Sequence, residues 1–124
     1  MNEYRYGKAY NLKIHGKFLA SLSGEEFVKI LKKAAEAAGA TCLNSVHFDF
    51  EPKGASGLLL LQESHYGFHS WPETNVICAV FYTCGQVDSS IAIEYIAKEL
   101  KVDKIVGMVY DYDEEKATNI CREY

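Results

Sequence analysis

Residues 23–39, SGEEFVKILKKAAEAAG, carry the strongest local structural signal in the sequence. Ser23 and Glu26 have the spacing of a capping box, in which each side chain satisfies a backbone N–H at the start of a helix. Apolar side chains then recur at helical spacing as far as Ala38, and Gly39 stands where a helix commonly ends. The segment therefore predicts an amphipathic helix that buries one face.

Short apolar stretches bounded by turn residues predict strands on both sides of this helix, at residues 6–14, 42–50, 57–61, 76–83 and 104–110. A second helix, capped by Asp88 or Ser89, is predicted between the last two of these strands. The tail from Asp111 onward is polar, and we expect it to be loose.

This order of elements predicts an α+β fold, a two-layer sandwich in which two helices cover one face of a mainly antiparallel sheet. It also suggests a duplicated strand–helix–strand unit on either side of a central hairpin. We expect residues 1–124 to form a single domain. The second face of the sheet needs a cover, and a second copy of the chain could provide it.

The composition excludes several classes of protein. The chain has 124 residues, of which 48% are hydrophobic and 24% charged, as in folded domains. Its formal charge of −4 argues against a nucleic-acid partner. No apolar run approaches the ~20 residues that span a bilayer, so no membrane partner is expected. The first residues carry no signal organisation, which makes the cytoplasm the expected location.

Four cysteines occur without a Cys-x-x-Cys pair, so neither a zinc ribbon nor a thioredoxin motif is predicted. We expect free thiols, with Cys42 and Cys78 as small buried apolar side chains.

Residues 62–73, QESHYGFHSWPE, bring serine, histidine and glutamate side chains together within a dozen positions, directly after a short apolar strand. An ordinary polar loop is one explanation. A metal site is another, but His65 and His69 would lie together only on a helix and about 13 Å apart on a strand. Gly67 and Pro72 disfavour a helix here, so no metal site is predicted. A serine hydrolase is a third, although the G-x-S-x-G elbow is missing.

The chain resembles the prokaryotic type of S-adenosylmethionine decarboxylase, a self-processing pyruvoyl enzyme of polyamine and spermidine biosynthesis. The resemblance runs continuously from about Glu25 to Leu100. Five segments in family order and spacing carry it: Ala37–Thr41, Pro52–Gly57, Glu63–His65, His69–Glu73 and Thr83–Gly85. The resemblance implies a carboxy-lyase that is made as a zymogen.

The resemblance implies that the Ser64 hydroxyl attacks the Glu63 carbonyl carbon and converts the peptide bond into an ester. Loss of the serine α-proton then breaks the ester, and hydrolysis leaves a pyruvoyl group on a chain of residues 64–124. Residues 1–63 form the other chain. The substrate amine would form a Schiff base with this pyruvoyl group, so neither a metal nor pyridoxal phosphate is implied.

Further residues receive roles through the same resemblance. His69 would remove the serine α-proton, and Ser56 would hydrogen-bond the oxyanion or ester. Cys84 would return a proton to the substrate after CO2 leaves. Glu73 would bind the ribose hydroxyls of S-adenosylmethionine, and Phe50 would stack on its adenine or cover its sulfonium. The expected assembly is a homodimer of processed chains.

Departures from the family pattern lie near the implied substrate pocket. Phe48 stands where the family usually has His, and Val80 where it usually has Asp. An arginine or ornithine decarboxylase on the same scaffold is therefore an alternative to S-adenosylmethionine decarboxylase. A non-catalytic, unprocessed relative that acts as a partner protein is a second alternative, against which the retention of Ser64, His69 and Cys84 speaks.

Overall fold

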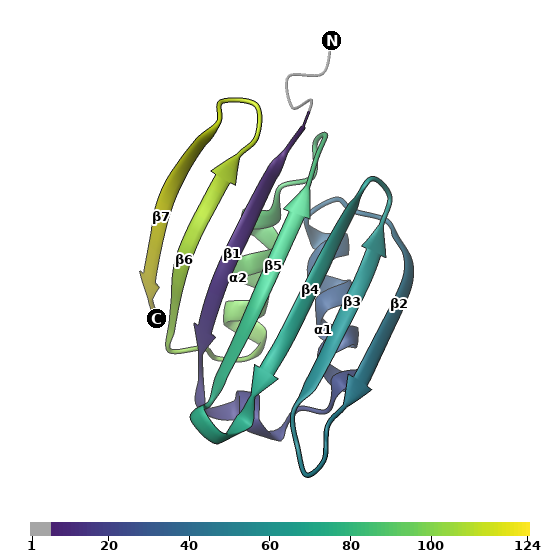
Figure 1. The fold of residues 1–124 in the computed structure, drawn as a ribbon, viewed down its shortest axis with the longest axis vertical. Helices are drawn as coiled ribbons and strands as arrows, with labels where there is room; N and C mark the ends of the chain where they lie inside the picture. Colours follow the sequence, from purple (N-terminus) through teal and green to yellow (C-terminus); the bar gives the residue numbers. More distant parts are fainter. Residues whose placement is uncertain (1–5) are drawn as a thin grey trace.

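The computed structural model describes residues 6–124 and has two layers, a seven-stranded antiparallel sheet and two α-helices on one of its faces (Figure 1). This arrangement confirms the predicted α+β sandwich. The elements in chain order are β1 (Lys8–His15), η1 (Lys17–Ser21), α1 (Gly24–Ala37), β2 (Cys42–Asp49), β3 (Ala55–Leu61), β4 (Ser64–Trp71), η2 (Pro72–Thr74), β5 (Val76–Thr83), α2 (Ser89–Glu99), β6 (Lys104–Asp111) and β7 (Lys116–Glu123).

Helix α1 begins and ends where the sequence predicts. The Ser23 hydroxyl accepts from the Glu26 N–H at 3.1 Å, and the Glu26 carboxylate accepts from the Ser23 N–H at 3.0 Å. Gly39 follows the last turn with a φ of 94°, in the left-handed region that glycine adopts without strain. The apolar face, with Phe27 and Leu31 at its centre, is buried against the sheet.

The strand order is β2-β3-β4-β5-β1-β6-β7, and every neighbouring pair is antiparallel. Along the chain, β1-α1-β2 and β5-α2-β6 flank the β3–β4 hairpin, as the predicted duplication requires. In space, β1 is inserted between β5 and β6 (Figure 1). The first strand of the chain is therefore held on both edges by strands from the second half.

The sheet is buried mainly on its helical side. Tyr66, Phe81 and Ile105 face the helices and are fully buried. The alternate positions form the opposite, helix-free surface, which we call the open face; its exposed apolar side chains are Val46, Phe48, Leu58, Leu60, Val80 and Met108, with 37–64% of each accessible.

Several expectations from the sequence are wrong in detail. The segment after β3 is itself a strand, β4, and the tail expected to be loose forms β7, which pairs with β6 over eight residues. Arg122 and Tyr124 at the end of the chain both contact the Glu94 carboxylate of α2, at 2.5 and 3.0 Å. Cys78, expected to be buried, is exposed on the open face, and Cys42 is half-buried.

Candidate active site

The β3–β4 hairpin turns through two residues, Gln62 and Glu63. Glu63 has a φ of 65°, a left-handed conformation that is uncommon for a residue other than glycine. Such a conformation costs on the order of 1–3 kcal/mol and persists only where the surroundings enforce it. The backbone immediately before Ser64 is therefore strained.

Ser64 opens β4 with its side chain on the helical side, where the residue is only 6% exposed. The end of β5 supplies its contacts. The Cys84 N–H donates to Ser64 Oγ at 3.3 Å, and the Cys84 thiol donates to the Glu63 carbonyl oxygen at 3.0 Å. We call Glu63, Ser64 and Cys84 the Ser64 group.

This geometry suits an attack of Ser64 Oγ on the carbonyl carbon that precedes it. The hydrogen bond from the Cys84 N–H would stabilise negative charge on the hydroxyl oxygen. The Cys84 thiol lies where charge would develop on the Glu63 oxygen, the position of an oxyanion-hole donor. Cys84 therefore contacts both the hydroxyl oxygen of Ser64 and the carbonyl oxygen that precedes it.

A second cluster lies nearer the other end of β4. Ser56 Oγ and His69 Nδ1 are 2.6 Å apart on neighbouring strands. The Phe50 and Trp71 rings flank the imidazole, with centroids 5.4 and 4.6 Å away. We call Phe50, Ser56, His69 and Trp71 the His69 group. Glu73 follows in η2, exposed at the same end of the sheet.

The structure does not bring these two groups together within one chain. Ser64 and His69 are five positions apart on one strand, which corresponds to roughly 17 Å. Because five is odd, their side chains also point to opposite faces, and the burial of alternate β4 residues agrees. The predicted action of His69 and Ser56 on Ser64 is therefore not met inside a single chain.

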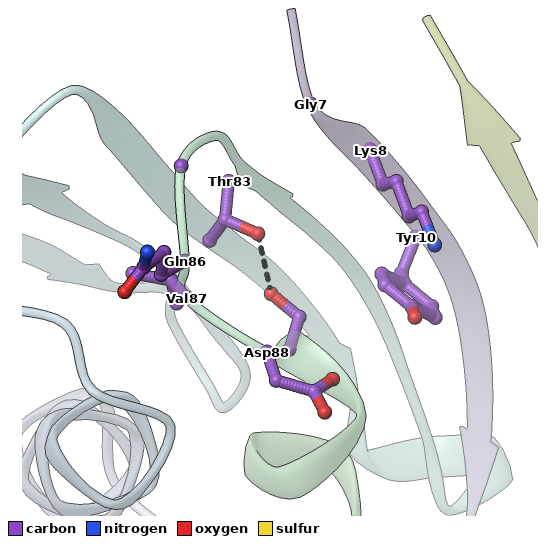
Figure 2. Close-up of a pocket in the computed structure, with 9 residues that line it drawn as sticks. Gly7, Lys8, Tyr10, Thr83, Gln86, Val87 and Asp88 are labelled. Atoms are coloured by element: carbon purple, nitrogen blue, oxygen red, sulfur yellow. Dashed lines mark hydrogen bonds between the residues drawn. The ribbon is translucent and has the colours of Figure 1, made fainter. Parts of the chain in front are cut away.

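A hollow of about 440 Å3 adjoins the Ser64 group on the helical side. Figure 2 shows Lys8 and Tyr10 of β1 on one side of it and Gln86, Val87 and Asp88 on the other. The remaining lining residues are Gly7, Thr83, Gly85 and Ser89. Since Thr83 and Gly85 flank Cys84 in the chain, the hollow adjoins the Cys84 backbone.

A buried chain of hydroxyls forms the floor of this hollow. Ser89 Oγ lies 3.0 Å from Thr83 Oγ1, the dashed contact in Figure 2, and 2.9 Å from the Tyr66 hydroxyl. Burial raises the pKa of Tyr66 to about 12, so this hydroxyl stays protonated at neutral pH. These hydrogen-bonded hydroxyls connect β4 and β5 to the first residue of α2.

Sequence reasoning assigned no individual role to Trp71. The sequence nevertheless contains a signal for it. Trp71 stands two positions after His69, so the two side chains lie on the same face once β4 is recognised as a strand. Among the described residues, no three His, Cys, Asp or Glu side chains are grouped so as to hold a metal ion. The helices of residues 6–124 are also too short or too polar to cross a membrane.

These observations define a class of molecule, a two-layer α+β protein in which one cysteine hydrogen-bonds a serine hydroxyl and the carbonyl group that precedes that serine in a left-handed turn. A profile of the S-adenosylmethionine decarboxylase family matches residues 19–111 of the 124. The chain therefore belongs to the S-adenosylmethionine decarboxylase family.

Individual relatives agree with this assignment. The chain is 45% identical over 85 residues to an S-adenosylmethionine decarboxylase proenzyme of Brevibacillus brevis, with 67% of this chain and 64% of the relative covered. A proenzyme of Prochlorococcus marinus is 40% identical over 96 residues, covering 76% and 77%. One of Thermoplasma volcanium is 40% identical over 78 residues, covering 62% and 60%. The chain thus spans about three fifths of the length of some of these relatives.

A solved structure is also similar. The crystal structure of the adenosylmethionine decarboxylase from Aquifex aeolicus superposes with a TM-score of 0.75 at 28% identity, covering 86% of this chain and 89% of that one. The fold similarity therefore extends beyond the segment that the family profile matches.

Proposed function

We propose that this protein is a pyruvoyl-dependent S-adenosylmethionine decarboxylase that processes itself between Glu63 and Ser64. One observation carries the proposal. Cys84 donates its thiol to the Glu63 carbonyl oxygen and its N–H to Ser64 Oγ, so both atoms of the expected acyl shift are held in a strained turn. Family membership supports the same chemistry.

Self-processing would start from the Ser64 hydroxyl. Attack on the Glu63 carbonyl carbon forms the Oγ–C bond and, as the C–N bond breaks, gives an ester with a free amine on Ser64. The left-handed backbone at Glu63 supplies part of the driving force, because breaking the peptide releases its strain. Removal of the Ser64 α-proton then expels the Glu63 carboxylate, and water replaces the nitrogen as ammonia leaves.

The carbonyl left on residue 64 would supply an electron sink for decarboxylation, the service that pyridoxal phosphate gives other enzymes. The proposal therefore includes neither pyridoxal phosphate nor a metal. Cys84 would hold a proton close to the reacting substrate, since its thiol lies 3.0 Å from the Glu63 oxygen at the site of cleavage. The hollow of about 440 Å3 beside Thr83 and Gly85 falls in the range of small-molecule sites.

A homodimer would supply what one chain lacks. The open face exposes large apolar side chains and holds a hollow of about 770 Å3 that includes Gly67 and His69. Position 67 lies about midway between Ser64 and His69 on β4. A two-fold axis between two packed open faces, parallel to the sheets, perpendicular to β4 and level with Gly67, would lay the partner's β4 antiparallel over this one, with the partner's His69 level with Ser64.

In such a dimer, the His69 group of one copy would serve the Ser64 group of the other. His69 would be the base for the α-proton, and Ser56, hydrogen-bonded to it, would contact the ester. Phe50 is 38% exposed beside His69, so its ring is free to meet the sulfonium or the adenine. Glu73 at the same end would accept the ribose hydroxyls.

Intact mass under reducing conditions tests the self-processing. We expect two chains, residues 1–63 and residues 64–124, with the second lighter by one ammonia than a chain that begins with serine. A single uncleaved species of 13.9 kDa would contradict the proposal and favour a non-catalytic relative.

Release of labelled CO2 tests the substrate. The processed protein is incubated separately with carboxyl-labelled S-adenosylmethionine, arginine and ornithine, and we expect release from S-adenosylmethionine. If CO2 is released only from arginine or ornithine, the proposed pyruvoyl chemistry stands and the proposed substrate is wrong. The matched control is the Ser64→Ala protein, which keeps the chain uncleaved. A cytoplasmic location stays a prediction from the sequence.

A further inference from the structure

Gly7, just before β1, packs directly on the backbone of the Ser64 group. Its φ is 91°, in the region that favours glycine. A Cβ at this position would lie 2.8 Å from Cys84 Cα and closer still to the Thr83 carbonyl oxygen. The Gly7 backbone therefore packs directly against the Cys84 backbone, and the space between them leaves no room for a side chain at position 7.

The turn between β6 and β7 holds the Gly7 backbone in place. The Asp113 carboxylate accepts from the Tyr6 N–H at 3.0 Å with one oxygen and from the Gly7 N–H at 3.2 Å with the other. Asp111 Oδ1 in turn accepts from the Asp113 and Glu114 N–H groups, at 2.9 and 3.1 Å, and sets the shape of the turn. A charged group that accepts two backbone N–H bonds is a strong and directional anchor.

Two further bonds hold the same segment. The Tyr82 hydroxyl donates to the Tyr6 carbonyl oxygen, and the Tyr112 N–H donates to the Gly7 carbonyl oxygen at 2.9 Å. The Tyr82 and Tyr112 rings meet edge to face, with centroids 5.6 Å apart. Burial and the nearby Cys84 raise the pKa of Tyr82, so its hydroxyl remains a donor. Residues 6–7 are thus held by β5 on one side and by the β6–β7 turn on the other, where Gly7 packs on the Cys84 backbone.

We propose that Asp113 is a positioning residue for Cys84, acting through the Gly7 backbone. Both Gly7 and Asp113 lie outside residues 19–111, the part of the chain that the family profile matches. The C-terminal hairpin of this chain therefore contributes to the reacting geometry from outside the matched segment. The role of Cys84 rests on the proposed function; its position against Gly7 does not.

The Cys84 thiol and N–H must both point at the Glu63–Ser64 peptide, from a residue that belongs to no strand or helix. Release of Gly7 would let the Thr83–Cys84 backbone move into the vacated space. A displacement of about 1 Å can slow a positioned reaction by as much as 10²-fold. We expect a smaller change here, because Gly85 and β5 still hold Cys84 from its other side.

The experiment compares three variants of the full chain. Asp113→Ala removes both acceptors, Asp113→Asn keeps one acceptor oxygen, and Glu114→Ala changes an exposed neighbour in the same turn. Two rates are measured, cleavage after residue 63 in freshly translated protein, and alkylation of Cys84 by iodoacetamide. Cys121, exposed on the edge strand β7, is the internal standard for the alkylation.

We expect Asp113→Ala to cleave about tenfold more slowly, and its Cys84 to be alkylated about tenfold faster relative to Cys121. Asp113→Asn should fall between Asp113→Ala and wild type, whereas Glu114→Ala should match wild type in both rates. Partial recovery of both rates in Asp113→Asn, which keeps one acceptor oxygen, distinguishes a positioning role of Asp113 from a general loss of stability. Wild-type rates in Asp113→Ala would overturn the proposal.

Tyr82→Phe repeats the test in a variant that keeps its ring and loses only the hydroxyl bond to Tyr6. We expect Cys84 alkylation to rise about threefold, the effect of one hydrogen bond. An unchanged alkylation rate in Tyr82→Phe would contradict an action through residues 6–7, just as wild-type rates in Asp113→Ala would contradict the role of Asp113. The two proposals fail separately. A wild-type protein that does not cleave refutes the proposed function, and the alkylation rates still report whether Asp113 positions Cys84.

Discussion

Cys84 contacts the carbonyl oxygen of Glu63 and the hydroxyl oxygen of Ser64, and the consequences at the scale of a residue follow from those two contacts. The thiol faces the carbonyl oxygen of Glu63, and the N–H faces the attacking hydroxyl. A side-chain substitution removes only the first contact. Self-processing and turnover should therefore respond differently to the loss of the thiol.

We predict that Cys84→Ala still cleaves, about tenfold more slowly than wild type, because the backbone N–H remains while a weak thiol donor is lost. Decarboxylation should fall by 10²-fold or more, the typical contribution of a positioned proton donor. Cleavage is followed by intact mass and turnover by CO2 release from the same preparations. Normal turnover in Cys84→Ala would remove this thiol from the active site.

At the scale of the elements, Tyr66 connects β4 to α2 through Ser89. Tyr66 is fully buried, and burial raises its pKa to about 12 against a usual value of 10. The folded state therefore binds the hydroxyl proton more tightly than the unfolded chain does. The stabilisation is fully present below pH 10, and it is lost as the pH rises from 10 to 12.

We predict that the free energy of unfolding falls above pH 10 by at most roughly 3 kcal/mol on account of this group. Tyr66→Phe should lack that part of the fall and be about 1 kcal/mol less stable at pH 8, because Ser89 loses a partner. Urea unfolding at pH 8 and 11.5 measures both, in a Ser64→Ala background so that each protein is one chain. Parallel curves for the two proteins would contradict the assignment.

The elements that the sequence predicted well are those with an apolar period or a cap. Strand β5 has its predicted bounds, and α1 follows its capping box. Strand β7 was missed because it is an edge strand whose residues are mostly exposed, so Lys116–Glu123 shows no apolar alternation. Strand β4 was missed because its serine and histidine side chains are typical of a polar loop, although Tyr66, Phe68 and Ser70 alternate as buried positions.

The candidate site was predicted as a list of residues, and its spatial division was not. The resemblance places Ser64, Cys84, Ser56 and His69 in one reaction. Their separation depends on the parity of β4, and parity has meaning only once the segment is known to be a strand. The role of Asp113 was out of reach, because contact between residues 6–7 and 113 depends on β1 and β6 being neighbours.

At the scale of the whole molecule, a shared site predicts complementation between two inactive variants. Ser64→Ala lacks the attacking hydroxyl but keeps His69, and His69→Ala keeps Ser64 but lacks the base. We predict that neither cleaves alone. When the two are co-expressed in equal amounts, about half of the His69→Ala chains should cleave, since half of them pair with a Ser64→Ala copy.

Intact mass of the co-expressed, differently tagged chains measures this fraction. The matched control is Ser64→Ala co-expressed with a Ser64→Ala, His69→Ala double variant, which offers no cleavable chain. Absence of cleavage in the first mixture would place the base elsewhere and leave the dimer without a catalytic role.

Because β1 lies between β5 and β6, cleavage after Glu63 would leave two polypeptides that are interlaced and cannot slide apart. The fragment with β1, β2 and β3 would keep the pairing of β3 with β4 and both ladders of β1. It could depart only by unfolding, and refolding would then require two molecules to meet. Maturation would thus convert a first-order folding reaction into a second-order one, and the mature protein, once denatured by heat, would recover faster at higher concentration.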